Sequence, residues 1–541
     1  MFNYKKLFST RRTPQSEPIA GTVANSAGGF VFAVDDWMRL DRFLVLGSEG
    51  GSYYATERAL TRENAEATIR AIQEDGERAV ARIVAISQSG RAPKNDPAIF
   101  ALALAASLGN DETKRIAMAG IPKVCRTGTH LFQFAETIEG FRGWGRGLRR
   151  GIAAWYTAKP VDQLALQVVK YRQRGGWSHR DLLRLAHPLT DDLARKELFD
   201  WVCRDSAGEA LPAIITAFTS LPKATSADEI AALIVEHDLP REAVPTEWLN
   251  DPKIWQALLQ RMPMTALVRN LGKLSAVGVV KPLGDGLPLV LSALRDANRV
   301  KKARVHPLAI LLALKTYAKG HGDKGSLIWE PVPQVIDALN AAFYTAFANV
   351  VPTGKRILLA LDVSGSMSGG SIAGTSLTPR EGSAAMALMT AATEENYHIV
   401  GFTSADGGWQ STPLLTPLPL TPSMRLDDAV KAVSNLPFGG TDCALPMLHA
   451  GEGPVLGCLR GLHRQRNLGR ENPSGTGAEG IPDKDRHPGE ARCGGHGGEQ
   501  VLHRRPGRRG NAGCCRLRRR GTRRNRGLHP WLGLGRFHDC T

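Results

Sequence analysis

The chain has 541 residues, of which 43% are hydrophobic, and carries a formal net charge of +17, a length that suffices for two or three domains. No apolar run reaches the ~20 residues of a membrane span, and residues 1–16 are basic without an apolar signal core. We therefore expect neither a membrane protein nor a secreted one.

The charge and the cysteines are unevenly distributed. Residues 451–541 hold 19 Lys and Arg against 8 Asp and Glu, together with five of the eight cysteines. The three earlier cysteines form no disulfide framework or zinc spacing, which favours a cytoplasmic location. Residues 123–185 hold 12 basic residues against 4 acidic ones. A basic zone on an otherwise nearly neutral body indicates a polyanionic partner.

Residues 1–35 are expected to form a disordered arm, and residues 36–348 predict helix after helix. Asp96 followed by Pro97 is typical of an N-cap and a first turn, and the apolar run that follows ends at Gly109. Ser178 and Asp181 have the spacing of a capping box. Strand-like alternation is scarce here, so we expect stacked helical pairs.

The strongest candidate for a binding surface lies on a helix that we predict to end at Gly175 and Gly176. On this helix Lys170 and Arg174 share one face, while Leu164, Ala165 and Val168 pack inward. Two cations displayed together suit phosphates. The alternative is a solvated helix face without a partner.

From residue 349 to 450 the pattern changes to that of an α/β domain with a parallel sheet. Strands are predicted at 357–361 and 397–402, and helices at 382–396 and 425–436, the last after a proline-rich connection over 413–422. Another helix is expected to open at Thr441.

Asp362, Ser364 and Ser366 directly follow the first of these strands. Open α/β sheets bind ligands at the carboxyl ends of their strands, and hard oxygen donors suit Mg²⁺. The alternative is a polar turn that caps the next helix. The pattern resembles the metal-ion-dependent adhesion site of von Willebrand factor A domains.

After residue 450 the sequence loses its periodicity and becomes rich in Arg, Gly, Pro, His and Cys. Read literally, residues 451–541 are a disordered tail of the RNA-binding RGG type. When codons that encode Gly457 to Asn472 are read displaced by one base, one possible translation is DAFVVYTDNETWAGKI. This translation has the pattern of a strand followed by Thr-Asp in a loop. Later segments of the displaced frame likewise give helix and strand patterns. We therefore interpret the tail as the product of a one-base frame change near residues 448–455.

Several long motifs, in this order, resemble the Ro autoantigen (TROVE module) family, and the resemblance covers about residues 36–450. The stretches that carry it are Met38–Tyr54, Arg126–Phe132, Trp144–Arg149, Lys170–Leu185, Leu267–Lys273 and Pro352–Arg356. The resemblance implies a monomeric ring of HEAT-like helical repeats closed by a von Willebrand A domain. The latter is incomplete here after about residue 450.

The resemblance also implies partners and sites. Ro proteins bind small structured noncoding Y RNAs on the outer basic surface and pass 3′ ends of misfolded RNAs through the ring. Bacterial members resemble adaptors that tether an exoribonuclease through the RNA. The RNA-binding candidates are Lys170, Arg172, Arg174, Arg180, His187, Arg146, Arg149 and Arg150. For His187 the alternative is a histidine favoured by a helix dipole, and for the arginines of 146–150 it is a solvated helix face.

In the metal site, Asp362, Ser364, Ser366 and Thr441 match the family. For Thr441 the alternative role is a helix N-cap. A further aspartate of the family site occurs here only in the displaced frame, so we expect Mg²⁺ binding to be impaired in the chain as written.

The sequence thus predicts a noncatalytic RNA-binding scaffold for RNA quality control or processing. The first alternative is a metal-dependent protein-adhesion module on a helical scaffold. A Mg²⁺-dependent phosphohydrolase ranks third, because Ser364 replaces the second carboxylate of an Asp-x-Asp motif.

Overall fold

The computed structural model describes residues 22–24, 30–32, 34–47, 65–90, 92, 94–322, 325–372, 375–402, 415–434, 436, 446, 449 and 458–462. Thr441, and most of the expected tail, lie outside these residues. No helix in the described part is long and apolar enough to cross a membrane.

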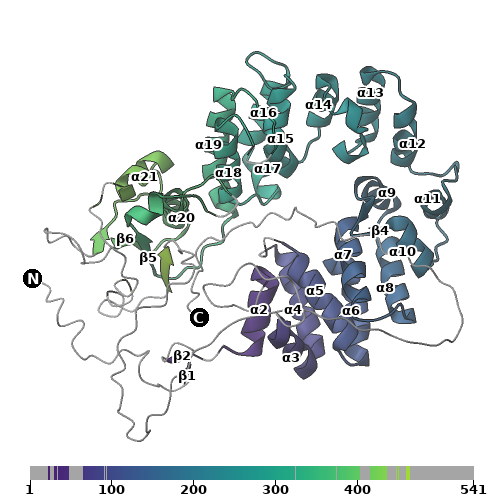
Figure 1. The fold of residues 1–541 in the computed structure, drawn as a ribbon, viewed down its shortest axis with the longest axis horizontal. Helices are drawn as coiled ribbons and strands as arrows, with labels where there is room; N and C mark the ends of the chain where they lie inside the picture. Colours follow the sequence, from purple (N-terminus) through teal and green to yellow (C-terminus); the bar gives the residue numbers. More distant parts are fainter. Residues whose placement is uncertain are drawn as a thin grey trace, which may run out of the picture. The chain divides into compact units, whose positions relative to one another are not determined.

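Between residues 36 and 345, the described part of the chain is mostly helical (Figure 1). Its helices are α2 (Asp36–Leu46), α3 (Glu66–Glu74), α4 (Gly76–Ser89), α5 (Asp96–Leu108), α6 (Asp111–Val124), α7 (Gly128–Glu139), α8 (Arg146–Thr157), α9 (Val161–Lys170), α10 (His179–Ala186), α11 (Leu193–Arg204), α12 (Ala213–Ser220), α13 (Ala227–His237), α14 (Pro252–Leu259), α15 (Met264–Ala276), α16 (Gly286–Arg295), α17 (Ala297–Lys302), α18 (Pro307–Ala318) and α19 (Pro333–Thr345). Short 3₁₀ turns include η3 (Arg241–Ala243) and η5 (Ala346–Asn349).

Neighbouring helices pack in pairs, for example α5 with α6, α13 with α14 and α18 with α19. The predicted stacking of helical pairs is confirmed, whereas closure into a ring stays a prediction. α5 ends at Leu108 with Gly109 as its C-cap, as expected, but Asp96 is its first residue and Asn95 occupies the N-cap position. The capping box of Ser178 and Asp181 is present at the start of α10.

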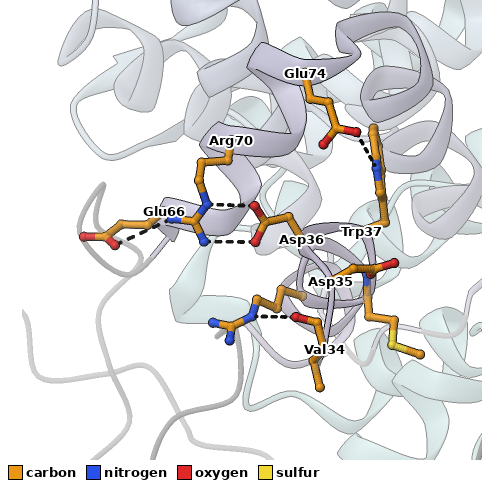
Figure 2. Close-up of polar contacts among 9 residues, drawn as sticks. Val34, Asp35, Asp36, Trp37, Glu66, Arg70 and Glu74 are labelled. Atoms are coloured by element: carbon orange, nitrogen blue, oxygen red, sulfur yellow. Dashed lines mark hydrogen bonds and ion pairs between the residues drawn. The ribbon is translucent and has the colours of Figure 1, made fainter. Parts of the chain in front are cut away.

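Polar contacts dock α2 onto α3 (Figure 2). Arg70 forms a two-pronged ion pair with Asp36, with Nε to Oδ2 at 2.7 Å and Nη2 to Oδ1 at 2.9 Å. The hydrogen bond from Arg70 lowers the pKa of the Asp36 carboxyl. Asp35 caps α2 by accepting from the Met38 amide. These contacts join the first helix of the series to the next.

The α/β region contains a four-stranded sheet in the order β7-β6-β5-β8, of which β5 and β6 are labelled in Figure 1. β5 (Ile357–Asp362) is parallel to β6 (Tyr397–Phe402) and to β8 (Cys458–Leu462), while β7 (Leu415–Pro417) is antiparallel to β6. The predictions of β5 and β6 are confirmed. β7 was not predicted and lies at the sheet edge, where a proline is tolerated. β8 lies beyond residue 450, where we expected no element of a core.

Two helices accompany this sheet, α20 (Pro379–Thr393) and α21 (Leu426–Ser434). α20 begins three residues before the predicted start, because Thr378 and Glu381 form a capping box around Pro379. It reaches the helical region through an ion pair between the Lys315 Nζ of α18 and Glu381 Oε1, at 2.8 Å. The Leu426 amide also donates to the Tyr344 hydroxyl of α19, at 2.8 Å.

Candidate RNA-binding surface and metal loop

The three arginines of α8 lie on one exposed face of that helix. Arg146, Arg149 and Arg150 are exposed, whereas Leu148 and Ile152 are buried. All three cations lie near the helix N-terminus, where the helix dipole favours negative charge. In the described part of the chain, no carboxylate lies within ion-pair distance of any of them. Their placement leaves positive charge available for an external anion.

Lys170 and Arg174 do not share a helix, which corrects the prediction. α9 ends at Lys170, and the chain then forms a hairpin from β3 (Gln173–Arg174) and β4 (Trp177–Ser178). Gly175 and Gly176, at the turn, have φ angles of 58° and 84°. Two left-handed residues in a row are typical of a two-residue hairpin turn and cannot continue a helix. The predicted inward face, Leu164, Ala165 and Val168, is nevertheless buried.

The hairpin still presents cations outward. Arg172 and Arg174 are exposed and Lys170 is half-buried. The Arg172 guanidinium carbon lies 5.2 Å from the centroid of the Phe218 ring, and Lys170 Nζ lies 5.6 Å from that of Tyr171. An aromatic ring orients a cation without neutralising it. These side chains therefore keep their charge for a polyanion.

Two of the predicted contact residues have a structural role. Arg180 donates from Nε to the Val202 carbonyl at 3.0 Å and from Nη2 to Asp205 at 2.8 Å, which ties α10 to the end of α11. His187 is the C-cap of α10, exposed, with φ 46° and its amide bonded to the Leu183 carbonyl. The helix-terminal alternative describes the His187 backbone, and its exposed ring remains available for contact.

A buried aromatic layer that we did not predict supports the hairpin. His179, only 2% exposed, bonds through Nδ1 to the Tyr156 hydroxyl at 2.8 Å and packs against Phe132 and Trp155. Burial lowers the pKa of His179 to about 4, although the carbonyls of Gln167 and Tyr171 act in the opposite direction. The only sequence signal was a histidine on the apolar side of α10.

Trp144 and Trp177 lie beside each other near the hairpin, with ring centroids 5.4 Å apart and planes tilted by 43°. Both are half-buried. Each ring therefore contributes both to packing and to the surface.

The Asp362 loop is a compact polar turn at the carboxyl end of β5. Asp362 and Ser364 are 2% and 4% exposed. The Ser364 amide donates to Asp362 Oδ1 at 2.8 Å, and the Ser364 and Ser366 hydroxyls are 2.9 Å apart. The structure thus brings together the three predicted ligands that it describes.

Arg380, which we did not predict, holds this loop. It is 4% exposed and donates to the Ser364 carbonyl at 2.8 Å, the Ser368 hydroxyl at 2.7 Å and, on α21, the Val433 carbonyl at 2.8 Å. Burial lowers the pKa of the guanidinium, while the charge of Asp362 opposes that shift. An arginine inside an otherwise apolar helix was the available signal.

The oxygen donors of this loop fit a hard cation such as Mg²⁺ in type, with one carboxylate and two hydroxyls in one turn. Within the described residues no group of three His, Cys, Asp or Glu side chains is placed to hold a metal. A site here therefore depends on hydroxyls and on ligands from elsewhere, such as the predicted Thr441.

Known protein families match both the helical region and the α/β region of the chain. The TROVE domain family model matches residues 23–229 and 235–355, and the Ro60 vWA domain model matches residues 356–454. A Deinococcus radiodurans protein named RNA-binding protein RO60 is 40% identical over 460 residues, which are 84% of this chain and 85% of the relative.

A Caenorhabditis elegans protein of the same name is 35% identical over 512 residues, covering 80% of this chain and 78% of the relative. The crystal structure of the Deinococcus radiodurans RO (RSR) protein aligns with a TM-score of 0.69 at 40% identity. That alignment covers 77% of this chain and 83% of the other.

Proposed function

Because the chain belongs to the TROVE-domain family of Ro proteins, we propose that it is an RNA-binding scaffold without catalysis of its own. The observation that carries the proposal is the set of outward cations on α8 and on the α9–β3 segment. No carboxylate among the described residues lies within ion-pair distance of Arg146, Arg149, Arg150 or Arg174. Such a surface suits a phosphate backbone.

The RNA we propose for this surface is a small structured noncoding RNA of the Y type. Arg146, Arg149 and Arg150 follow one face of a helix, and Arg172 and Arg174 extend the charge along the hairpin. Exposed cations that are not tied to carboxylates suit a phosphate backbone by charge and position rather than by base sequence. We further propose that the protein takes up 3′ ends of misfolded RNA and reaches an exoribonuclease through its RNA, in the cytoplasm.

A filter-binding assay with a structured small RNA tests the surface. We expect Lys170→Ala/Arg174→Ala to weaken RNA binding about tenfold or more at low salt. The slope of log affinity against log salt concentration should become shallower by about 1.5, since two phosphate contacts are lost. Lys301→Ala/Lys302→Ala removes two exposed cations from α17 and serves as the matched control. Equal RNA affinity of wild type and the first variant at every salt concentration would refute the proposal.

For the Asp362 loop we propose Mg²⁺, held by Asp362, Ser364 and Ser366 together with Thr441. A bound cation there would supply a positive centre for an oxygen of a partner. The adjacent hydroxyls of Ser364 and Ser366 favour the second candidate function, metal-dependent adhesion to a protein. Isothermal titration of the full chain with Mg²⁺ tests it. Because the further aspartate of the family site is absent from the chain as written, we expect weak binding of Mg²⁺, with its heat lost in Ser364→Ala/Ser366→Ala. Heat that is absent from the wild type, or unchanged in the variant, would exclude the loop.

We also propose that the tail is out of frame. The match to the Ro60 vWA model ends at residue 454, inside the predicted interval 448–455. β8 begins at Cys458, close to where the displaced frame also starts a strand. Sequencing the gene across codons 445–460 tests the idea. A confirmed, uninterrupted reading frame there would exclude a sequencing error and leave only an old mutation.

A further inference from the structure

A cavity of about 640 Å³ opens among α14, α15 and α18 and the segment around Trp329. It shares no residue with the basic surface or with the Asp362 loop. Its volume lies in the range of sites for small organic molecules. Nothing in the proposed RNA surface accounts for this cavity.

The charged residues of the cavity are all cationic among those described. Arg241 comes from η3, and Arg269 and Lys273 come from α15, one helical turn apart. Lys273 Nζ donates to the Asn250 side-chain oxygen at 2.7 Å, a neutral partner that leaves the charge uncompensated. Neither arginine has a carboxylate within ion-pair distance in the described part of the chain. The cavity therefore favours an anion.

The remaining walls are mostly apolar and aromatic. Trp255, Trp329, Val268 and Leu312 contribute to them. The Arg241 guanidinium carbon lies 5.8 Å from the centroid of the Trp255 ring. A ligand that satisfies both parts must join a flat apolar body to a negative group.

The aromatic walls are held in place before any ligand enters. Trp329 Nε1 donates to the Tyr317 carbonyl at 2.9 Å, and the Tyr317 hydroxyl bonds to the Ser275 hydroxyl at 2.7 Å. A Cβ on Gly272 would lie 2.7 Å from the Trp329 ring, so only glycine allows the indole this close to α15. Fixed walls reduce the entropy lost on binding.

We propose that this cavity binds a nucleoside phosphate. The base would occupy the apolar part, and the phosphate would meet Arg269 and Lys273. Asn270 Nδ2 donates to the Ala266 carbonyl at 2.8 Å, so the Asn270 side-chain oxygen and the Thr316 hydroxyl would offer hydrogen bonds to the sugar or base. The same chemistry has two sources, a free nucleotide or the terminal nucleotide of a single-stranded RNA. The cavity shares no residue with the basic surface, so the two sites can fail separately, and the RNA-end source rests on the proposed uptake of RNA 3′ ends.

Isothermal titration of the full chain with adenosine 5′-monophosphate is the central experiment. We expect saturable binding, and at least about tenfold weaker binding of both ribose 5-phosphate and adenosine, which each lack one half of the ligand. Arg269→Gln and Lys273→Met should each weaken the nucleotide at least about tenfold, because each removes one charge-assisted contact. Arg261→Gln, an exposed arginine outside the cavity, is the matched control.

A short oligoadenylate distinguishes the two sources. Tighter binding of the oligonucleotide than of the mononucleotide, lost in Arg269→Gln, would identify the end of an RNA chain. Equal or weaker binding of the oligonucleotide would identify the free nucleotide. Lys170→Ala/Arg174→Ala should leave binding of the mononucleotide unchanged. The proposal is overturned if neither probe shows binding that depends on Arg269 and Lys273, or if ribose 5-phosphate binds as tightly as the nucleotide.

Discussion

The surface of the β3–β4 hairpin exposes its charged side chains, whereas the Asp362 loop buries them. Around the hairpin, Arg172 and Arg174 point outward and have no carboxylate partner among the described residues. In the loop, Asp362 and Arg380 are almost fully buried, and backbone and hydroxyl groups satisfy them. Exposed charge acts at long range and is screened by salt. Buried charge fixes a geometry and acts only on what reaches it.

This difference in burial predicts whether a substitution changes the binding of a polyanion or the stability of the fold. Truncating an exposed cation of the hairpin should change the binding of a polyanion and leave folding almost unaffected, because exposed charges contribute little to stability. Truncating a buried polar group should change folding first, because its partners lose their hydrogen bonds without access to water.

The largest effect is expected from Arg380→Met. The substitution leaves the carbonyls of Ser364 and Val433 without a donor in a buried setting, so we expect a loss of about 4 kcal/mol in the stability of the sheet region. Hydrogen exchange of the β5 and β6 amides measures that loss locally.

Arg425→Met is the control for Arg380→Met, since Arg425 is exposed just before α21. It should leave exchange within experimental error of wild type. Protection of β5 that survives Arg380→Met unchanged would show that the loop does not depend on the arginine, and the contrast with the hairpin would fail.

The second effect concerns the buried aromatic layer around His179, where acid should lower the stability of the fold. The folded-state pKa of about 4 lies below the ordinary value of 6.5, so the unfolded chain binds more protons between these values. Stability is therefore complete above pH 6.5 and falls as the pH drops toward 4, by up to about 3 kcal/mol. Denaturant unfolding followed by the fluorescence of nearby Trp155 measures this dependence.

His179→Phe should flatten the acid dependence without removing it, because burial also lowers the pKa of His130 to about 4. His187→Asn is the control, since His187 is exposed and asparagine tolerates its left-handed backbone. An acid dependence in His179→Phe as steep as in wild type would contradict the assignment to His179.

The sequence predicted the parts of this contrast that depend on local patterns. The strand at Ile357, the capping box of Ser178 and the inward face of α9 follow from apolar spacing and cap residues, and all are present. The Asp362 motif is likewise contiguous, so its three described ligands were found together.

What sequence reasoning missed depends on contacts between distant segments or on very short elements. Each strand of the β3–β4 hairpin has two residues, too few to show alternation, so Gly175 and Gly176 were taken for a helix end. Arg380 reaches Val433 across 53 positions. The cavity draws on residues from Arg241 to Trp329, and no local spacing indicates such a set.

A smaller effect tests the hairpin turn itself. Gly176 has φ 84° and open space where a Cβ would lie, so Gly176→Ala should cost only the backbone strain, about 1 kcal/mol. Gly176→Asn should cost less, since asparagine enters this region more readily. Thermal unfolding ranks the variants. An alanine variant as stable as wild type would mean that the turn relaxes, and RNA affinity should then also be unchanged.

The smallest effect is expected at the ion pair of Lys315 and Glu381, which links the helical region to the α/β region. Burial alone would raise the pKa of Glu381, but hydrogen bonds from Lys315 and Thr378 outweigh it, and the net shift is downward. The stabilisation is thus present above the ordinary carboxyl pKa of 4.5 and is lost as the pH falls through the lower folded value. A double-mutant cycle of Lys315→Met and Glu381→Gln should give a coupling of about 0.5 kcal/mol at pH 7, since the pair is partly exposed. The coupling should vanish once the pH lies below the folded-state pKa of Glu381. A coupling that persists below that pKa would show that packing of the Lys315 stem, rather than charge, joins α18 to α20.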